Sequence, residues 1–307
     1  MCPFYEYLIK NKKTNLKGLG VALITPFTSE GAIDFDAIPS VVNNISSGGA
    51  DYLVVLGTTA EVSCLSPTEK KDVIAAVLKA NNGKLPLVIG IGGNNTAAVM
   101  EEIMHTDLSQ FQAILSVSPY YNKPSQEGIY QHYAYLAQVS PIPLIVYNVP
   151  SRTGTSVSSE TFLRLAHDYD NIIAIKEASG DMAQAEEILK KCPSHIQVIS
   201  GDDALTLPML LAGAVGTISV LGNALPQPIK RMFHYVENGE LEKAYRLHYQ
   251  LLDMVHLLFE EGNPVGIKAL MKSLSLCSHS VRLPLVPATK RLSERIESVL
   301  EATLFTV

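Results

Sequence analysis

The sequence predicts a (β/α)8 barrel followed by a small helical region. Short β-branched runs alternate with longer segments of helical periodicity, and the runs number eight. The runs are almost continuously apolar, which is typical of parallel strands buried on both faces. Because eight β-then-α units close a barrel, this count favours a barrel over an open sheet.

The expected strands are the apolar runs that end in polar or glycine-containing segments. They span residues 19–25, 52–56, 87–91, 113–117, 143–147, 172–176, 196–200 and 215–219. The segments between them carry apolar residues three or four positions apart, as expected of helices packed outside a sheet. Ser66, Ser125 and Ser158 each precede acidic residues at the expected helix starts, so we predict that they cap those helices.

The chain divides into three expected parts. We expect residues 1–15 to form an N-terminal extension, 16–238 the (β/α)8 barrel, and 239–307 a C-terminal helical region. In the last part an apolar stripe begins at Leu241, and Asn263 with Pro264 interrupts it. Further helices are expected over residues 265–274 and 289–300.

Composition indicates a globular protein with a sizeable core. The 307 residues are 47% hydrophobic and 18% charged, and 24 Lys and Arg against 30 Asp and Glu give a net charge of −6. No basic run is longer than Lys12-Lys13 or Lys190-Lys191. We therefore expect no nucleic-acid partner, because such binding needs a basic surface.

Targeting signals and metal motifs are not evident. No apolar run reaches about eighteen residues, and the first residues lack the pattern of a signal peptide, so we expect neither membrane insertion nor export. The four cysteines are too sparse for a disulfide framework, which favours the reducing cytoplasm. The eight histidines have no metal-binding spacing, and no metal is expected.

A doubly wound dinucleotide-binding sheet is the structural alternative. It requires a glycine-rich turn after the first strand, but Gly18 and Gly20 lie before or within that strand. Residues 90–94 hold the next glycine cluster. It lacks the third glycine of the G-x-G-x-x-G pattern and an acidic residue about 20 positions later at the end of a second strand. We interpret this cluster as a tight strand-to-helix turn with an asparagine cap.

Polar residues gather where the expected strands end, which in a barrel is where chemistry takes place. Lys176 closes the run 171–175, in which every residue after Asn171 is apolar. Because side chains alternate along a strand, either Lys176 or Glu177 points into the barrel. Lys176 is either a rim lysine paired with a carboxylate or an inward amine. Apolar surroundings would favour the uncharged form of that amine, which can attack a ketone.

Other strand ends offer groups with two interpretations each. Tyr147 is expected on the neighbouring strand at the height of Lys176. It is either a proton shuttle or an aromatic core residue. Thr58 and Thr59 would either bind a carboxylate or cap a helix. Arg152 would either bind a second carboxylate or lie in solvent. The pair Asp202-Asp203 is expected to cap the next helix rather than to act in acid-base chemistry.

Five segments together resemble a known family. They are GTTAE at 57–61, YYNKP at 120–124, YNVPSRTG at 147–154, IKEA at 175–178 and SGDD at 200–203. In this order and at strand ends, they resemble the pyruvate-dependent class I aldolase family, which includes N-acetylneuraminate lyases. The resemblance runs from about Leu16 to the last helix.

The resemblance implies a role for each matching residue. Lys176 is implied to be the Schiff-base lysine, and Tyr147, Thr59 and Tyr121 a proton-relay triad. Tyr121 is implied to reach into the site of a neighbouring subunit, which requires at least a dimer; family members are commonly dimers of dimers. The implied substrate-binding residues are Thr58, Thr59, Arg152, Gly201 and Ile218.

The implied reaction needs no metal or organic cofactor, since Lys176 itself forms the covalent intermediate. The family members most similar to this chain condense pyruvate with L-aspartate 4-semialdehyde. The product is 4-hydroxy-tetrahydrodipicolinate, in the committed step of diaminopimelate and lysine biosynthesis. A retro-aldol lyase acting on N-acetylneuraminate and a catalytically silent keto-acid-binding barrel are the alternatives. Thr58 and Arg152 favour the condensation, because sialic acid lyases usually carry serine at the first position and lack the arginine.

The lysine-inhibitor pocket of regulated family members is only partly matched. Asn94 and Tyr120 match, whereas Pro67 or Lys70 and Ala98 stand where a histidine and a glutamate are usual. We therefore predict that inhibition by lysine is weak or absent.

Overall fold

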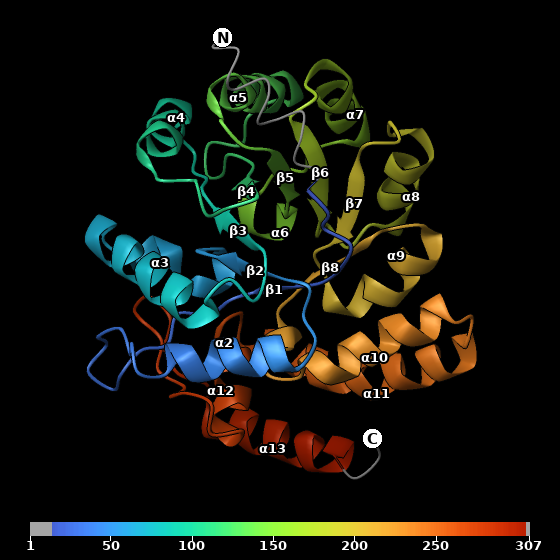
Figure 1. Ribbon diagram of the computed structural model, residues 1–307. Helices are drawn as coiled ribbons and strands as arrows, with labels where there is room; N and C mark the ends of the chain where they lie inside the picture. Colours follow the sequence, from blue (N-terminus) through green and yellow to red (C-terminus); the bar gives the residue numbers. More distant parts are fainter. Residues whose placement is uncertain (1–13, 305–307) are drawn as a thin grey trace. The chain divides into compact units, whose positions relative to one another are not determined.

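The computed structural model describes residues 14–304 (Figure 1). Eight strands follow one another in chain order in a closed barrel, which confirms the predicted fold class. The ladders joining β1 to β2 and β3 through β8 are parallel. The strands are β1 (Gly18–Ala22), β2 (Tyr52–Val55), β3 (Leu87–Gly90), β4 (Ala113–Val117), β5 (Leu144–Asn148), β6 (Ile172–Glu177), β7 (Gln197–Ser200) and β8 (Gly216–Ser219).

The first strand is shorter than the sequence predicts. Residues 23–25 were expected to continue it, but the backbone leaves the ladder after Leu23. Ile24 donates its N–H to the side chain of Asn223, at 3.1 Å, and the Thr25 hydroxyl donates to the carbonyl of Ala60, at 2.8 Å. Side-chain bonds have replaced the strand hydrogen bonds at this point.

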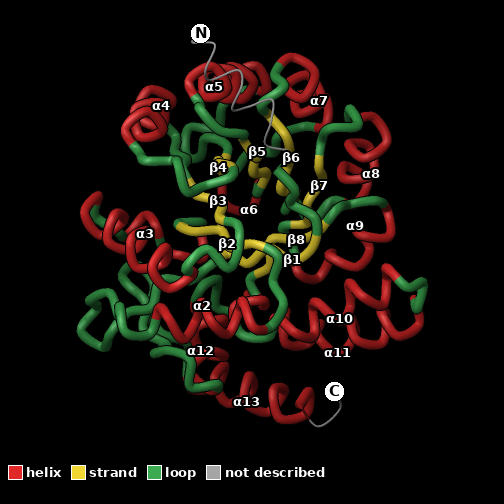
Figure 2. Tube along the Cα trace, in the orientation of Figure 1, coloured by secondary structure: helices red, strands yellow, loops and turns green. Residues whose placement is uncertain are grey.

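One compact unit consists of Pro86–Ile218 and the segment that ends at Lys17. Its longer helices lie outside strands β4 to β7, as Figure 2 shows, and α4–α5, α5–α7, α7–α8 and α8–α9 are in contact. The helices are α4 (Thr96–His105), α5 (Gln126–Val139), α6 (Pro150–Thr153), α7 (Ser159–Asp168), α8 (Met182–Lys191), the 3₁₀ turn η3 (Asp203–Leu205) and α9 (Thr206–Ala212).

The other unit consists of Gly18–Leu85 and the chain from Ser219 onward. Within it α10 packs against α11, and α13 lies against both α11 and α12 (Figure 1). Its helices are α2 (Ile38–Ser47), η1 (Thr58–Ala60), η2 (Val62–Cys64), α3 (Pro67–Asn81), η4 (Leu221–Asn223), α10 (Pro226–Glu237), α11 (Leu241–Glu260), α12 (Val265–Ser273) and α13 (Lys290–Leu304).

The three C-terminal helices confirm the helices predicted after residue 239. The break predicted at Asn263 and Pro264 falls between α11 and α12. Residues 1–13 and 305–307 lie outside the described residues, and with them Cys2 and most of the proposed N-terminal extension. The proposed domain boundaries stay predictions.

The predicted serine caps are all present. The hydroxyl oxygens of Ser66, Ser125 and Ser158 accept backbone N–H groups at the starts of α3, α5 and α7. After the glycine cluster at 90–94, the cap of α4 is Asn95, the residue beyond the expected one.

Glu69 gives the start of α3 a pH-dependent contribution to stability. The guanidinium of Arg282 at 2.6 Å and the backbone N–H of Ser66 at 2.8 Å lower the pKa of the Glu69 carboxyl from 4.5 to about 2. Since the folded state has the lower pKa, this contribution is complete above pH 4.5 and is lost as the pH falls toward about 2.

We expect the Glu69→Gln substitution to lower the free energy of unfolding at neutral pH. The difference from the parent protein should shrink as the pH falls through this range. Denaturant unfolding at a series of pH values measures it, with Ser66→Ala as a variant that removes only the cap. A difference that stays constant between pH 5 and about 2.5 would contradict the assignment.

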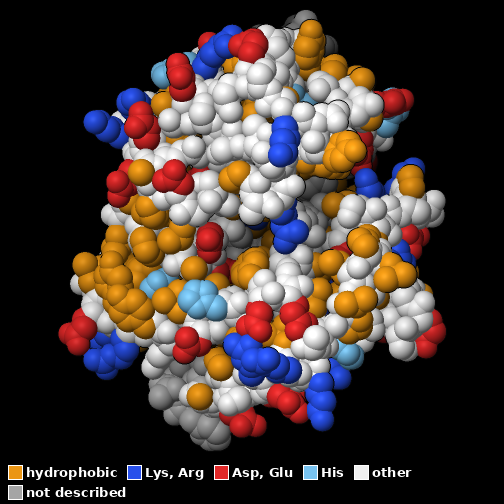
Figure 3. Space-filling view, turned by 180° about the vertical axis from the view of Figure 1, so that it is seen from behind, with side chains coloured by type: hydrophobic (Ala, Val, Ile, Leu, Met, Phe, Trp, Pro, Cys, Tyr) orange, Lys and Arg blue, Asp and Glu red, His pale blue; other side chains and the backbone are white. Residues whose placement is uncertain are grey.

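The described residues were compared with the predictions on charge, membrane spans, metal sites and cysteines. Lys and Arg side chains are interspersed with Asp and Glu on the face drawn in Figure 3. No helix between residues 14 and 304 is long and apolar enough to cross a bilayer. In the same part of the chain, no three His, Cys, Asp or Glu side chains group as metal ligands, and Cys64, Cys192 and Cys277 are free thiols.

Candidate active site

Lys176 lies inside the unit that contains β3 to β7. Its strand, β6, pairs with β5 on one side and β7 on the other, and the registers place Tyr147 and Ile199 opposite Lys176. Only 5% of Lys176 is exposed. The residues before it are mostly buried and mostly β-branched, which favours a strand, and Lys176 lies near the end of that strand.

Lys176 and Tyr147 are direct neighbours. The Nζ of Lys176 lies 4.4 Å from the centroid of the Tyr147 ring, and Tyr147 is itself 7% exposed. Between residues 14 and 304, no carboxylate lies within ion-pair distance of Lys176. The interpretation of Lys176 as a rim lysine paired with a carboxylate is therefore wrong, and the inward interpretation holds.

Gly201 makes room for the lysine side chain. A Cβ atom built on Gly201 would lie 2.9 Å from Cε of Lys176 and 2.6 Å from Cβ of Ala178, closer than van der Waals contact permits. The β7–β8 register pairs Ser200 with Thr217, so buried Ile218 stands at the level of Gly201. The structure thus brings Lys176, Tyr147 and Gly201 together, with Ile218 one strand further.

Glu177 takes the opposite face of β6 and has a structural role. Its carboxylate accepts both Nδ2 contacts of Asn148, at 3.0 and 3.2 Å, the backbone N–H of Ser179 at 2.7 Å and Nε2 of Gln184 at 2.9 Å. Four contacts satisfy a buried carboxylate. Glu177 therefore joins β6 to β5 and α8 and fixes the strand end that carries Lys176.

Tyr121 and Arg152 stand on surface segments after β4 and β5. Tyr121 is 85% exposed and has a φ of 74°, in the left-handed region that costs a non-glycine residue about 1 kcal/mol or more. Arg152 is exposed on the four-residue helix α6. The structure leaves both side chains at the surface, in contrast to buried Tyr147.

The other unit holds Thr58 and Thr59. Both lie in η1, whose N-cap is Gly57, and neither hydroxyl makes a capping hydrogen bond, so the helix-cap interpretation of these threonines is wrong. Thr59 is 2% exposed, and its Oγ1 accepts a hydrogen bond from Nδ2 of Asn263 at 3.0 Å. The Asp202 cap, in contrast, is confirmed: its Oδ1 accepts the N–H of Ala204 at 2.9 Å.

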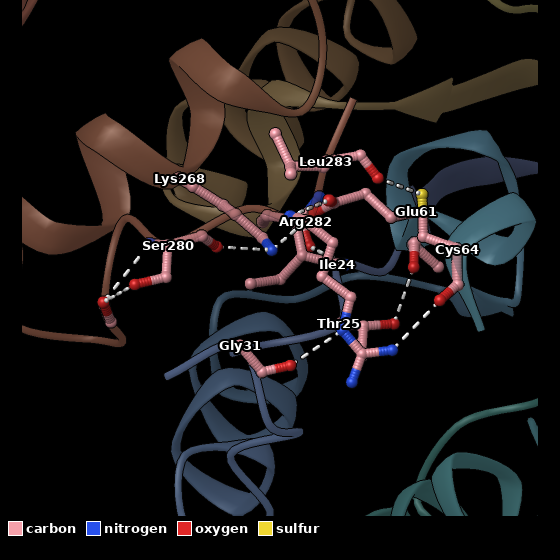
Figure 4. Close-up of polar contacts among 12 residues, drawn as sticks. Ile24, Thr25, Gly31, Glu61, Cys64, Lys268, Ser280, Arg282 and Leu283 are labelled. Carbon is pink, nitrogen blue, oxygen red and sulfur yellow. Dashed lines mark hydrogen bonds and ion pairs between the residues drawn. The ribbon is translucent and has the colours of Figure 1, made fainter. Parts of the chain in front are cut away.

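Three residues near the Thr59 turn were not predicted to have a role. Asn263 contacts Thr59, and the fully buried Lys268 donates to Oε1 of Glu61 at 2.6 Å (Figure 4). For Asn263 the sequence pattern indicates only a helix break. The sequence does carry a signal for Lys268, because it is a charged residue within the otherwise apolar run VGIKALM.

Comparison with known proteins shows to which family this chain belongs. The model of the dihydrodipicolinate synthetase family matches residues 15–303. The chain belongs to this family.

Individual relatives cover almost the whole chain. The 4-hydroxy-tetrahydrodipicolinate synthase of Flavobacterium psychrophilum is 52% identical over 280 residues, covering 91% of this chain and 96% of that protein. The synthase of the same name from Parabacteroides distasonis is 46% identical over 286 residues, covering 93% and 96%. The crystal structure of dihydrodipicolinate synthase from Thermotoga maritima has a TM-score of 0.90 at 35% identity, covering 94% and 98% of the two chains.

Proposed function

We propose that this protein is a lyase that condenses pyruvate with L-aspartate 4-semialdehyde to 4-hydroxy-tetrahydrodipicolinate, in lysine and diaminopimelate biosynthesis. The observation that carries the proposal is Lys176, buried at a strand end beside Tyr147 and with no ion-paired carboxylate in the described chain. The protein's membership of the dihydrodipicolinate synthetase family agrees with it.

The chemistry begins at the amine of Lys176. It adds to the ketone carbon of pyruvate, and loss of water from the carbinolamine leaves an iminium. The iminium draws electrons from the neighbouring methyl group, which loses a proton and becomes an enamine. The enamine carbon attacks the aldehyde of the second substrate. The amine of that substrate then displaces Lys176 by transimination, and the ring closes. No metal or organic cofactor enters these steps.

The candidate site residues have distinct proposed tasks. Tyr147, Thr59 and Tyr121 pass protons to and from the carbinolamine. Thr58 and Thr59 bind the pyruvate carboxylate, and Gly201 and Ile218 leave a small pocket for the keto acid. Gly201 supports this, because any side chain at 201 would collide with Lys176.

Tyr121 supports a homo-oligomer, with at least a dimer and a dimer of dimers as the proposed assembly. Tyr121 is 85% exposed on its own chain, as expected of a residue that enters the site of another subunit. We also place the protein in the cytoplasm, where it would meet its two metabolite substrates.

Two parallel assays with the purified protein test the proposed function. The first mixes pyruvate with L-aspartate 4-semialdehyde and follows product formation; the second offers N-acetylneuraminate and follows pyruvate release. We expect turnover only in the first. Cleavage of N-acetylneuraminate with no condensation would identify the retro-aldol lyase, and no reaction in either assay would favour the silent keto-acid-binding barrel.

Arg152→Ala tests the choice of second substrate. Because Arg152 is proposed to bind the carboxylate of the semialdehyde, we expect its KM to rise about tenfold or more, while pyruvate still forms its adduct on Lys176. Arg246→Ala, which removes an exposed arginine on α11, is the matched control. An unchanged semialdehyde KM in Arg152→Ala would refute this assignment.

Lysine inhibition provides a separate test of the partly matched inhibitor pocket. With Pro67 or Lys70 and Ala98 in place of the usual histidine and glutamate, we expect lysine to inhibit weakly or not at all. Initial rates at increasing lysine concentration measure this. An inhibition constant in the submillimolar range would contradict the prediction.

A further inference from the structure

Arg152 stands on a loop whose two ends are joined by one buried side chain. This Arg152 loop, residues 149–157, follows β5 and contains the one-turn helix α6. Asn148, the last residue of β5, is 0% exposed. Its Oδ1 accepts the backbone N–H of Val157 at 2.9 Å, and its Nδ2 donates to Oγ of Ser156 at 3.2 Å. The side chain of Asn148 therefore closes the loop at its base.

Gln126 holds the same end of the Arg152 loop from another helix. It is the exposed first residue of α5. Its Nε2 donates to the carbonyl of Ser156 at 2.8 Å. Its Oε1 accepts the backbone N–H of Ser158 at 3.0 Å and the hydroxyl of Thr161 at 2.7 Å. One side chain thus ties the start of α5 to the end of the loop and to the first turn of α7.

The helix within the loop is too short to hold Arg152 in place by itself. The backbone N–H groups of Arg152 and of the two residues after it bond the carbonyls of Val149 and Pro150, which makes a single turn. Such a turn is not stable alone in water, because fixing its backbone costs more than its few hydrogen bonds return. The backbone of Arg152 therefore depends for its position on anchors outside α6, such as Asn148 and Gln126.

The asparagine also connects the Arg152 loop to the strand that carries Lys176. Nδ2 of Asn148 lies 3.0 and 3.2 Å from the two carboxylate oxygens of Glu177. The register pairs these two residues one position beyond Lys176. The amide of Asn148 keeps this orientation because its oxygen has to face the N–H of Val157. Asn148 thus links the base of the loop directly to the end of β6.

The proposed reaction requires a fixed separation between Lys176 and Arg152. Pyruvate is bound covalently to Lys176, and Arg152 binds the carboxylate of L-aspartate 4-semialdehyde. This small substrate has to bring its aldehyde to the enamine while its carboxylate contacts the guanidinium. A displacement of about 1 Å in such an arrangement can cost about 100-fold in rate. The anchors of the Arg152 loop are therefore expected to affect the second substrate.

We propose that Gln126 and Asn148 are positioning residues that determine where Arg152 meets the second substrate. This inference rests on the proposed function, in which Arg152 binds the semialdehyde. Gln126 acts at the end of the Arg152 loop. Asn148 acts at the base of the loop and, through Glu177, at the end of β6. Neither residue touches substrate in this proposal; both act through the loop.

Gln126→Ala is the first test, because an exposed side chain can be removed with the fold intact. We expect the KM for the semialdehyde to rise about 3- to 10-fold, while the rate of adduct formation with pyruvate stays within about twofold of the parent rate. Gln126→Glu keeps the acceptor for Ser158 and Thr161 and loses only the donation to Ser156. Its semialdehyde KM should lie between those of the parent and of Gln126→Ala. Steady-state kinetics and borohydride trapping measure the two quantities.

Gln131→Ala is the matched control for Gln126→Ala. Gln131 is exposed on the same helix, and its Nε2 donates to Oε1 of Glu127 at 2.7 Å, outside the Arg152 loop. Its semialdehyde KM and its rate of adduct formation should match those of the parent protein. A semialdehyde KM in Gln126→Ala no higher than in Gln131→Ala would overturn the role of Gln126.

A double-mutant cycle with Arg152→Ala separates position from stability at Asn148. We expect Asn148→Ala to raise the semialdehyde KM in the parent background and to have no further effect on it once the guanidinium is gone. Its effect on the unfolding midpoint should be equal in both backgrounds, because the same buried hydrogen bonds are lost in each. Asn148→Ser, which keeps a hydroxyl, replaces Asn148→Ala if the alanine variant does not fold. Effects on KM that multiply in the double variant would overturn the positioning role.

Borohydride trapping with pyruvate distinguishes failure of this inference from failure of the proposed function. If the parent protein forms no adduct on Lys176, the proposed function fails, and this inference fails with it. If the adduct forms and Arg152→Ala raises the semialdehyde KM, but neither Gln126→Ala nor Asn148→Ala does, only the positioning roles fail.

Discussion

Replacing Lys176 with methionine abolishes the reaction if the amine is the nucleophile, and the loss in kcat should be on the order of 10⁴-fold or more. Methionine has a similar length and no amine, and 95% of Lys176 is enclosed, so the folded state should tolerate it. The condensation assay and the circular dichroism melting curve measure the two effects. No pyruvate adduct should be detectable.

Lys190→Met is the matched control, since Lys190 is exposed on α8 in the same unit. It should keep full activity. If Lys176→Met retained activity within about tenfold of the parent protein, some other group would be the nucleophile and the proposed mechanism would be wrong.

The Tyr147→Phe substitution should produce the second largest loss, about 10²- to 10³-fold in kcat. The ring beside Lys176 is preserved, but the phenol that is proposed to move protons at the carbinolamine is gone. The adduct with pyruvate should still form, more slowly. Single-turnover trapping at increasing times measures its rate, and steady-state kinetics measures kcat.

Tyr133→Phe is the appropriate comparison for Tyr147→Phe. Tyr133 is fully buried in the same unit, and its hydroxyl donates to the carbonyl of Ser116 at 2.8 Å. Its loss should lower stability by about 1 kcal/mol and leave kcat nearly unchanged. Equal kcat values for Tyr147→Phe and Tyr133→Phe would indicate that Tyr147 is only a core residue.

The barrel and Lys176 could be predicted because their signals are local in the sequence. Each strand is a short apolar run, and a lysine that ends such a run is conspicuous against its neighbours. The alternation along β6 left two orientations open. The side-chain contacts decide between them, because Glu177 accepts a hydrogen bond from Gln184 of the outer helix α8, whereas the Nζ of Lys176 lies beside the Tyr147 ring.

The contacts around Thr59 could not be predicted, because they join distant parts of the chain. Asn263 is 204 residues from Thr59, and Lys268 is 207 residues from Glu61. Only the tertiary course of α12 and of the turn before it brings these residues together. The predicted end of β1 at residue 25 is wrong for a similar reason, because Ile24 bonds Asn223, which is 199 residues away.

Borohydride reduction in the presence of pyruvate, followed by peptide mapping, tests the central claim most directly. The account predicts one stable adduct, whose mass is that of reduced pyruvate bound through nitrogen, on the peptide that contains Lys176. Protein treated with borohydride alone should remain unmodified. An adduct on another lysine, or none, would contradict the account.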